Sequence, residues 1–182
     1  MKNIALVNMA DTGSASYSTR IALEYFGYFV GWHGIGRPRH LMDILSGKTP
    51  CSYDCVLLSC HGDDDGKILM PFMHGELYEP DEPRGNFGFD EVSRCIKLKN
   101  TLIINDGCST GNEALVKAFA RNGNIYIAPT DDPEGSSALI FVQLFFYYLC
   151  YNNFNIDDAY KKASGLDEET AMFKLFREGN IC

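Results

Sequence analysis

Two short segments of the chain combine an apolar run with residues that could do covalent chemistry. Residues 57–62 read Leu-Leu-Ser-Cys-His-Gly, and residues 103–108 read Ile-Ile-Asn-Asp-Gly-Cys. A cysteine thiolate is a strong nucleophile, and a histidine imidazole exchanges a proton readily near neutral pH. If the two segments end side by side, His61 and Cys108 form the pair that nucleophilic catalysis by a thiol needs.

Glycines flank both of these candidate catalytic residues. Gly62 lets the backbone approach a substrate closely, so its amide and that of Cys108 could donate hydrogen bonds to an oxyanion. Gly107 permits the sharp turn that lifts Cys108 to the rim. A helix is expected to begin a few residues after Cys108, and its positive end is expected to lower the thiol pKa.

Other histidines and cysteines have alternative interpretations. His74-Gly75 is a second His-Gly pair, but it follows a poorer strand and lies in a predicted loop. Cys60 is expected to face the core, because cysteine is often simply a small buried residue. Cys51 and Cys55 are spaced like half of a zinc site, but no second pair follows with sensible spacing. We therefore predict no metal and no cofactor.

Two polar loops could hold ligands but lack the spacing that such sites need. Residues 63–65 are three aspartates that could bind calcium, but the EF-hand spacing is absent and a solvated turn is the alternative. Residues 11–16 could cradle a phosphate, but they lack the glycine-rich pattern, so Ser14 or Ser16 is predicted to cap a helix. A cysteine phosphatase would need arginine at position 114, where this chain has Ala114.

These residues must be positioned by alternating strands and helices. Apolar runs predict strands at 4–7, 53–60, 101–105 and 124–128, with half of a hairpin at 69–73. Helical spacing predicts helices at 14–29, 39–45, 89–96, 111–121, 136–151, 156–164 and 168–178. Residues 31–40 and 73–88 are interpreted as loops. Continuous apolar strands separated by helices predict a doubly wound, mostly parallel sheet in a three-layer α/β domain, where ligands bind beyond the carboxyl ends of the strands.

Length and composition limit the class of protein. The chain has 182 residues, a length that fits one domain over 1–182 with a substantial core. Its formal net charge of −8 disfavours nucleic acid as a partner.

The apolar stretch 138–150 is too short to span a membrane and is predicted to form a buried helix, so no membrane partner is expected. With no export signal at the start, the cytoplasm is the expected compartment, where thiols stay reduced. We interpret three further cysteines as structural or terminal: Cys95, Cys150 and Cys182.

The order of these motifs resembles the caspase-like cysteine peptidases, which include caspases, metacaspases, gingipains, separase and the CHAT domains. An apolar strand ends in His61-Gly62, and a second ends in a small residue and Cys108, 47 residues later. The resemblance extends over about residues 3–165, including the strand at 125–128 and the segment 155–163. The Gln-Ala-Cys-x-Gly signature of caspases is absent, and residues 106–111 are nearer to the CHAT type.

The resemblance implies a caspase-like fold and an endopeptidase acting on a protein or peptide substrate. Cys108 would attack the scissile carbonyl, His61 would transfer the proton, and the amides of Gly62 and Cys108 would hold the oxyanion. An acidic pocket for a basic P1 side chain is implied at Asp131 and Asp132, or at residues 63–65. The alternative function is a catalytically inactive caspase-like module that binds or signals.

Overall fold

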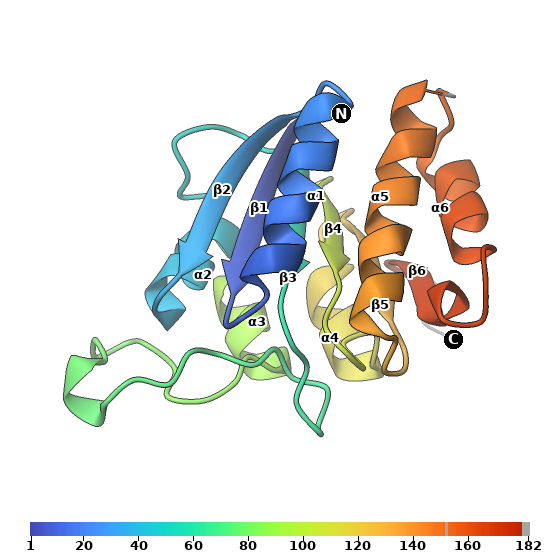
Figure 1. Cartoon of the computed structure of the whole chain (residues 1–182). Coiled ribbons are helices and arrows are strands. Elements are labelled where there is room, and N and C mark those ends of the chain that lie inside the picture. Colours follow the sequence, from blue (N-terminus) through green and yellow to red (C-terminus); the bar gives the residue numbers. More distant parts are fainter. Residues whose placement is uncertain (152, 180–182) are drawn as a thin grey trace.

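The computed structural model describes residues 1–151 and 153–179, which form one six-stranded sheet with helices on both faces (Figure 1). The strand order is β2-β1-β3-β4-β5-β6, in which the first five strands are parallel and β6 is antiparallel to β5. The strands are β1 (Asn3–Met9), β2 (Phe29–Ile35), β3 (Cys55–Ser59), β4 (Leu102–Asn105), β5 (Ile125–Pro129) and β6 (Phe173–Arg177). The helices are α1 (Gly13–Tyr25), α2 (Pro38–Leu45), α3 (Phe89–Cys95), α4 (Glu113–Phe119), α5 (Gly135–Tyr151) and α6 (Ile156–Ser164), with single 3₁₀ turns η1 (Gly75–Leu77) and η2 (Thr170–Met172).

The hydrophobic core lies in two layers, one on each face of the sheet. Successive side chains of a strand point to opposite faces, so each central strand contributes to both layers. Helices α2, α3 and α4 cover one face, and helices α1, α5 and α6 cover the other. Leu57 and Ile104 face the second layer, whereas Leu58 and Ile103 face the first. The predicted three-layer, doubly wound α/β fold is confirmed.

The edge strand β2 was not predicted. Sequence spacing extended the first helix to Phe29 and assigned residues 31–40 to a loop because of their glycines. Instead, α1 ends at Tyr25, and β2 pairs in parallel with the whole of β1. Gly31 fits this strand because a Cβ there would clash with the hydroxyl group of Tyr53. Thr12 occupies the N-cap position of α1 without a capping hydrogen bond from its side chain, and the predicted caps Ser14 and Ser16 lie inside the helix.

The C-terminal strand β6 replaces the helix predicted at 168–178. Phe173 and Leu175 pack into one core layer, and Phe176 packs against the other, so the segment carries the two-residue alternation of a strand. Pairing with β5 outweighs the helix propensity of the surrounding Glu, Ala, Met and Lys residues. The hairpin predicted at 69–73 is also wrong, because only Ile68 forms bridges, to Gly62 and to Phe87.

The long loop between Ile68 and Phe87 is fastened to the start of α2. Glu82 is buried, and its carboxylate accepts hydrogen bonds from the Arg37 side chain at 2.7 and 2.8 Å and from the Arg39 amide at 2.9 Å. These bonds, chiefly those to Arg37, lower the pKa of Glu82 to about 2. Arg39 also pairs with Asp81 and Glu79. The loop is therefore held by ion pairs around one buried carboxylate.

Helix α5 forms as predicted from residues 138–150, but only one side of it is buried. Phe141 and Phe145 are fully buried, whereas Ile140 and Tyr147 are exposed. Within the part of the chain that is described, no helix is both long and apolar enough to cross a membrane. The six cysteines described are free thiols, and Cys182 lies outside the described residues.

Candidate active site

The carboxyl ends of β3 and β4 bring His61 and Cys108 to one cavity. The two strands are hydrogen-bonded neighbours, with Leu58 paired to Asn105, so the segments that follow them emerge at the same edge of the sheet. The cavity has a volume of about 310 Å³. Its walls come from the ends of the strands and from the starts of α1 and α5: Asp11, Thr12, Ser14, Ala15, Ser59, Cys60, His61, Asp106, Cys108, Pro133, Gly135 and Ala138.

The two segments touch through their backbones at Gly62. A Cβ atom built on Gly62 would overlap the carbonyl oxygen of Cys108 and lie 2.9 Å from its carbonyl carbon. A Cβ on Gly107 would lie 2.9 Å from the Cys60 sulfur and 3.1 Å from the Gly62 nitrogen. A side chain at Gly62 would therefore collide with backbone, and one at Gly107 would force the Cys60 sulfur to move, which explains the glycines seen beside the candidate residues. Among the described residues, the amides of Gly62 and Cys108 have no hydrogen-bond acceptor on another residue of the protein.

His61 has a carboxylate partner that the sequence did not indicate. Its Nε2 atom lies 2.7 Å from Oδ1 of Asp11, which follows β1. The His61 side chain is 48% exposed and that of Asp11 is 89% exposed, so the pair stands at the mouth of the cavity. The hydrogen bond to His61 is the main cause of a lowered pKa at Asp11. Asp11 therefore remains a carboxylate that can orient the imidazole.

Asp106 is a second carboxyl group of the site that sequence reasoning did not single out. Its Oδ1 accepts a hydrogen bond from the Cys60 amide at 2.9 Å, which links the end of β4 back to the end of β3. Burial raises the pKa of Asp106 to about 6, although the hydrogen bonds from Cys60 and Ser59 oppose this shift. In the sequence, only its position two residues before Cys108 indicates that Asp106 belongs to the site.

The Cys108 thiol is partly buried, and its pKa is raised. Burial is the main cause, followed by the negative charge of Asp132 and smaller effects of Asp106 and Glu134. The expectation that a following helix would lower this pKa is therefore wrong. Helix α4 begins only at Glu113, five residues later, so its positive end is too far away to offset burial and acidic neighbours.

The segment after β5 packs against the turn that carries Cys108. Ser109 has a positive φ of 53°, and its amide donates to the Asp131 carbonyl at 3.0 Å. Its hydroxyl donates to Oδ1 of Asp132 at 2.8 Å. Both aspartates are exposed, and neither carboxylate pairs with a basic side chain among the residues described. Asp132 thus lies next to the Cys108 turn, while its charge remains available.

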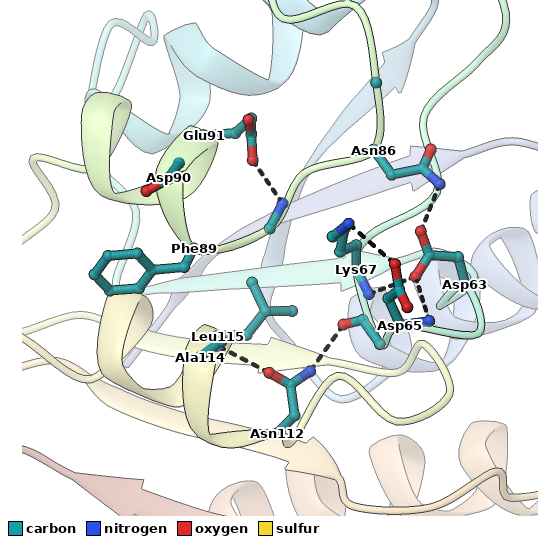
Figure 2. A pocket seen from close by; sticks show the side chains of 13 residues that line it. Asp63, Asp65, Lys67, Asn86, Phe89, Asp90, Glu91, Asn112, Ala114 and Leu115 are labelled. Carbon is teal, nitrogen blue, oxygen red and sulfur yellow. Dashed lines mark hydrogen bonds and ion pairs between the residues drawn. The ribbon is translucent and has the colours of Figure 1, made fainter.

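Of the three aspartates at 63–65, Asp63 and Asp65 line a different cavity, of about 540 Å³, between the 63–67 loop and the starts of α3 and α4. Figure 2 shows how the loop's carboxylates are already engaged: Asp63 accepts hydrogen bonds from the amides of Asp65 and Lys67 and from the Asn86 side chain. Asp65 pairs with the Lys67 ammonium at 3.1 Å. These acidic groups therefore hold the loop in shape, and this cavity contains neither His61 nor Cys108.

Of the competing candidates, His74, Cys51 and Cys55 do not line the Cys108 cavity, whereas Cys60 forms part of its wall. His74 is exposed in the long loop, where its ring contacts Phe72. Cys60 is buried in the core, as predicted, with its sulfur 3.0 Å from Oδ1 of Asn105. Cys51 is exposed and Cys55 is fully buried. Among the described residues, no three His, Cys, Asp or Glu side chains are grouped so that they could hold a metal ion.

Comparison with known proteins gives structural similarity without sequence similarity. No family model matches the chain, and no curated protein matches it. Gingipain R from Porphyromonas gingivalis, described as an Arg-specific cysteine proteinase, superposes with a TM-score of 0.56 at 13% identity over 94% of this chain. Separase from Saccharomyces cerevisiae, solved with securin, gives 0.61 at 12% identity over 97%. Caspase-1 from Spodoptera frugiperda gives 0.51 at 15% identity over 97%.

The lengths of these proteins differ greatly. The chain spans 43% of the gingipain R chain, 12% of the separase chain and 83% of the caspase-1 chain. At such low identity, the shared feature is the arrangement of the sheet and its helices. The mostly parallel six-stranded sheet, the helices on both faces and these three structural neighbours together show that the chain has the caspase-like α/β fold.

Proposed function

We propose that this protein is a cysteine endopeptidase in which Cys108 is the nucleophile and His61 is the general acid and base. One observation carries the proposal: the cysteine and the histidine follow the ends of adjacent parallel strands and line the same cavity. In an open parallel sheet, this edge is where ligands bind. The structural neighbours add support at the level of the fold, because gingipain R is described as a cysteine proteinase.

The reaction begins with a neutral thiol, because burial and nearby carboxylates keep the pKa of Cys108 high. His61 accepts the thiol proton as the sulfur attacks the carbonyl carbon of the scissile peptide bond. The imidazolium then gives that proton to the leaving amine, which departs and leaves a thioester. Finally, His61 takes a proton from water, the resulting hydroxide attacks the thioester, and the thiol is restored. Asp11 acts as a positioning residue that holds the imidazole at Nε2.

The amides of Gly62 and Cys108 are the proposed oxyanion donors. Both amides lie where the two segments touch, and within the described residues neither is used by an acceptor on another residue. A free backbone N–H directed at the developing negative charge stabilises a tetrahedral intermediate strongly in a partly dry site. The tight contact at Gly62 would fix the distance between the two donors.

We further propose that the enzyme prefers a basic side chain at P1, recognised by Asp131 and Asp132. Asp132 is tied to Ser109, next to the nucleophile, and both carboxylates lack a cationic partner among the residues described. A bound Lys or Arg side chain would also offset the negative charge that opposes thiolate formation at Cys108. The substrate would then help to activate the thiol that attacks it. We also propose the cytoplasm as the compartment, because a thiol nucleophile such as Cys108 stays reduced there.

The test of the mechanism is covalent labelling with a peptidyl acyloxymethyl ketone that carries arginine at P1, together with hydrolysis of the matching fluorogenic peptide. We expect the probe to label Cys108 selectively, and Cys108→Ala to lose labelling and hydrolysis. His61→Ala should reduce hydrolysis by at least about 100-fold, the usual contribution of a general acid and base. Cys51→Ala, which removes an exposed thiol outside the cavity, is the matched control and should leave both unchanged.

Equal labelling of Cys51 and Cys108, with no hydrolysis of any peptide in a library, would refute the peptidase and favour a non-catalytic binding module. The P1 preference is tested separately by Asp131→Asn and Asp132→Asn. These variants should lose cleavage after Arg and Lys while cleavage after a neutral residue is retained. If the ratio of basic to neutral cleavage does not change, Asp131 and Asp132 do not form the specificity pocket.

A further inference from the structure

Helices α1 and α5 carry large apolar side chains on their outer surface, which the proposed reaction does not use. In α1, Tyr17, Ile21 and Tyr25 are 59%, 51% and 81% exposed. Because they are four residues apart, they form one stripe along the helix, opposite to the buried Leu23. We name the exposed set on the two helices the α1–α5 patch; it consists of Tyr17, Ile21, Tyr25, Ile140, Tyr147 and Tyr151.

The two stripes belong to one surface. Helices α1 and α5 stand side by side on the same face of the sheet (Figure 1). The ring of Phe26, directly after α1, packs edge-on against Tyr147 and Tyr151 of α5, with centroids 6.0 Å apart in each case. A shallow apolar cavity of about 300 Å³ lies at this junction, between Phe26 and the outward residues of α5. An exposed apolar surface of this extent on a soluble domain marks an interaction site.

The charge of this surface identifies the kind of partner that it fits. The chain as a whole has a formal net charge of −8, so two copies repel each other wherever acidic faces meet. Helix α5 has no charged residue among its 17 residues, and α1 has only Arg20 and Glu24, which pair with each other at 2.8 Å. The patch therefore offers no unpaired carboxylate that could bind a cationic partner. It is neutral and apolar, so the patch of a second copy can pack against it without charge repulsion.

The size of the patch is also sufficient for a dimer. With roughly 200 Å² for the full surface of a tyrosine or isoleucine residue, the exposed area of the six patch residues adds up to about 700 Å². A specific interface buries about 600–1,000 Å² on each partner, a range that includes this area. We propose that a second copy of this chain docks on the α1–α5 patch to form a symmetric dimer in which the patch of each copy faces that of the other. In a two-fold dimer both copies use the same surface, which suits a patch made of like residues.

The first experiment measures oligomeric state by sedimentation velocity and light scattering from about 0.5 to about 200 μM. We expect the full chain to dimerise within this range. The double variant Tyr25→Asp/Tyr147→Asp should weaken the dimer by at least about 30-fold, because buried aromatic anchors dominate interface energies. Phe72→Asp is the matched control: Phe72 is 88% exposed in the long loop and should leave the dimer unchanged.

The second experiment tests whether the molecule that docks on the α1–α5 patch is a second copy of the chain. The variant Tyr25→Lys/Tyr147→Lys should be monomeric alone, and so should Tyr25→Asp/Tyr147→Asp. Mixed together, they should form a one-to-one dimer. Lysine on one copy then faces aspartate on the other, whether each position meets its own counterpart or position 25 meets position 147. A chain that stays monomeric at every concentration overturns the proposal, whether or not it binds anionic lipid vesicles or another protein. A dimer that survives in both double variants overturns it too. Neither experiment depends on peptidase activity.

Discussion

Replacing Gly62 with alanine tests the contact on which the candidate site is built. The added methyl group would overlap the Cys108 carbonyl oxygen and lie 2.9 Å from the carbonyl carbon. Both atoms belong to the backbone of a turn that is fixed by Ser109 and by the end of β4, so no side chain can swing aside to make room. The two strand ends must separate by more than about 1 Å, and overpacking of this kind costs about 2–4 kcal/mol in the free energy of unfolding.

The assay is equilibrium unfolding in urea, followed by circular dichroism. With an m-value of about 2 kcal/mol/M, the midpoint of Gly62→Ala should fall by roughly 1–2 M. Gly75→Ala is the matched control, because a Cβ there meets no atom within 4 Å, and its midpoint should remain within the error of the wild type. The rate of Cys108 alkylation should change in Gly62→Ala as the turn moves. A loss of stability below about 0.5 kcal/mol, with an unchanged alkylation rate, would refute the close contact of the two segments.

Three further predictions concern stability. Glu82→Gln should cost about 2–3 kcal/mol, because it removes the buried partner of an arginine, whereas Glu79→Gln on the exposed side of the same cluster should cost less than about 1 kcal/mol. In the wild type, the contribution of Glu82 to the free energy of unfolding is present above pH 4.5 and is lost as the pH falls toward its folded pKa of about 2. The stabilities of wild type and Glu82→Gln, measured by unfolding at each pH, should therefore converge near that pH. The effect of pH on stability has the opposite direction at Asp106, because its folded pKa of about 6 lies above its ordinary value of 3.8. The free energy of unfolding should therefore fall as the pH rises from about 4 to about 6. Asp106→Asn should abolish this decrease, which is measured by unfolding at each pH. Phe173→Ala should cost about 3–5 kcal/mol because the ring is fully buried, whereas Phe72→Ala should leave the melting temperature unchanged; equal effects would contradict the packing of β6.

The central strands and most helices were predictable because their signals are local. The runs that became β3, β4 and β5 are continuously apolar, as buried parallel strands must be, and their predicted bounds differ by one or two residues from those observed. Helix α6 was predicted with its bounds of Ile156–Ser164, and in the structure Asn155 caps it and acidic residues fill its first turn. In each case the side chains of the element itself carry the information.

The two edge strands were not predictable in the same way. In β2, Gly31 and Gly34 interrupt the apolar pattern, and only the pairing with β1 makes the segment a strand. In β6, residues with good helix propensity form a strand because β5 offers an unpaired edge and both core layers accept an aromatic ring. Tertiary pairing overrode local preference in both segments. Local sequence was also insufficient for the Cys108 thiol, whose pKa is raised by burial and by carboxylates that include Asp132 and Glu134 from the segment after β5.

The order of the strands in the sheet decides which side chains meet at the candidate site. Five strands are parallel, so the segments after β1, β3, β4 and β5 all emerge at one edge. Asp11, His61, Cys108 and Asp132 lie in these four segments, in that order across the sheet. Because β4 lies between β3 and β5, Cys108 is placed between a histidine on one side and an acidic loop on the other. The residue types were visible in the sequence, but the Asp11–His61 pair follows only from β1 and β3 being neighbours, which no local pattern encodes.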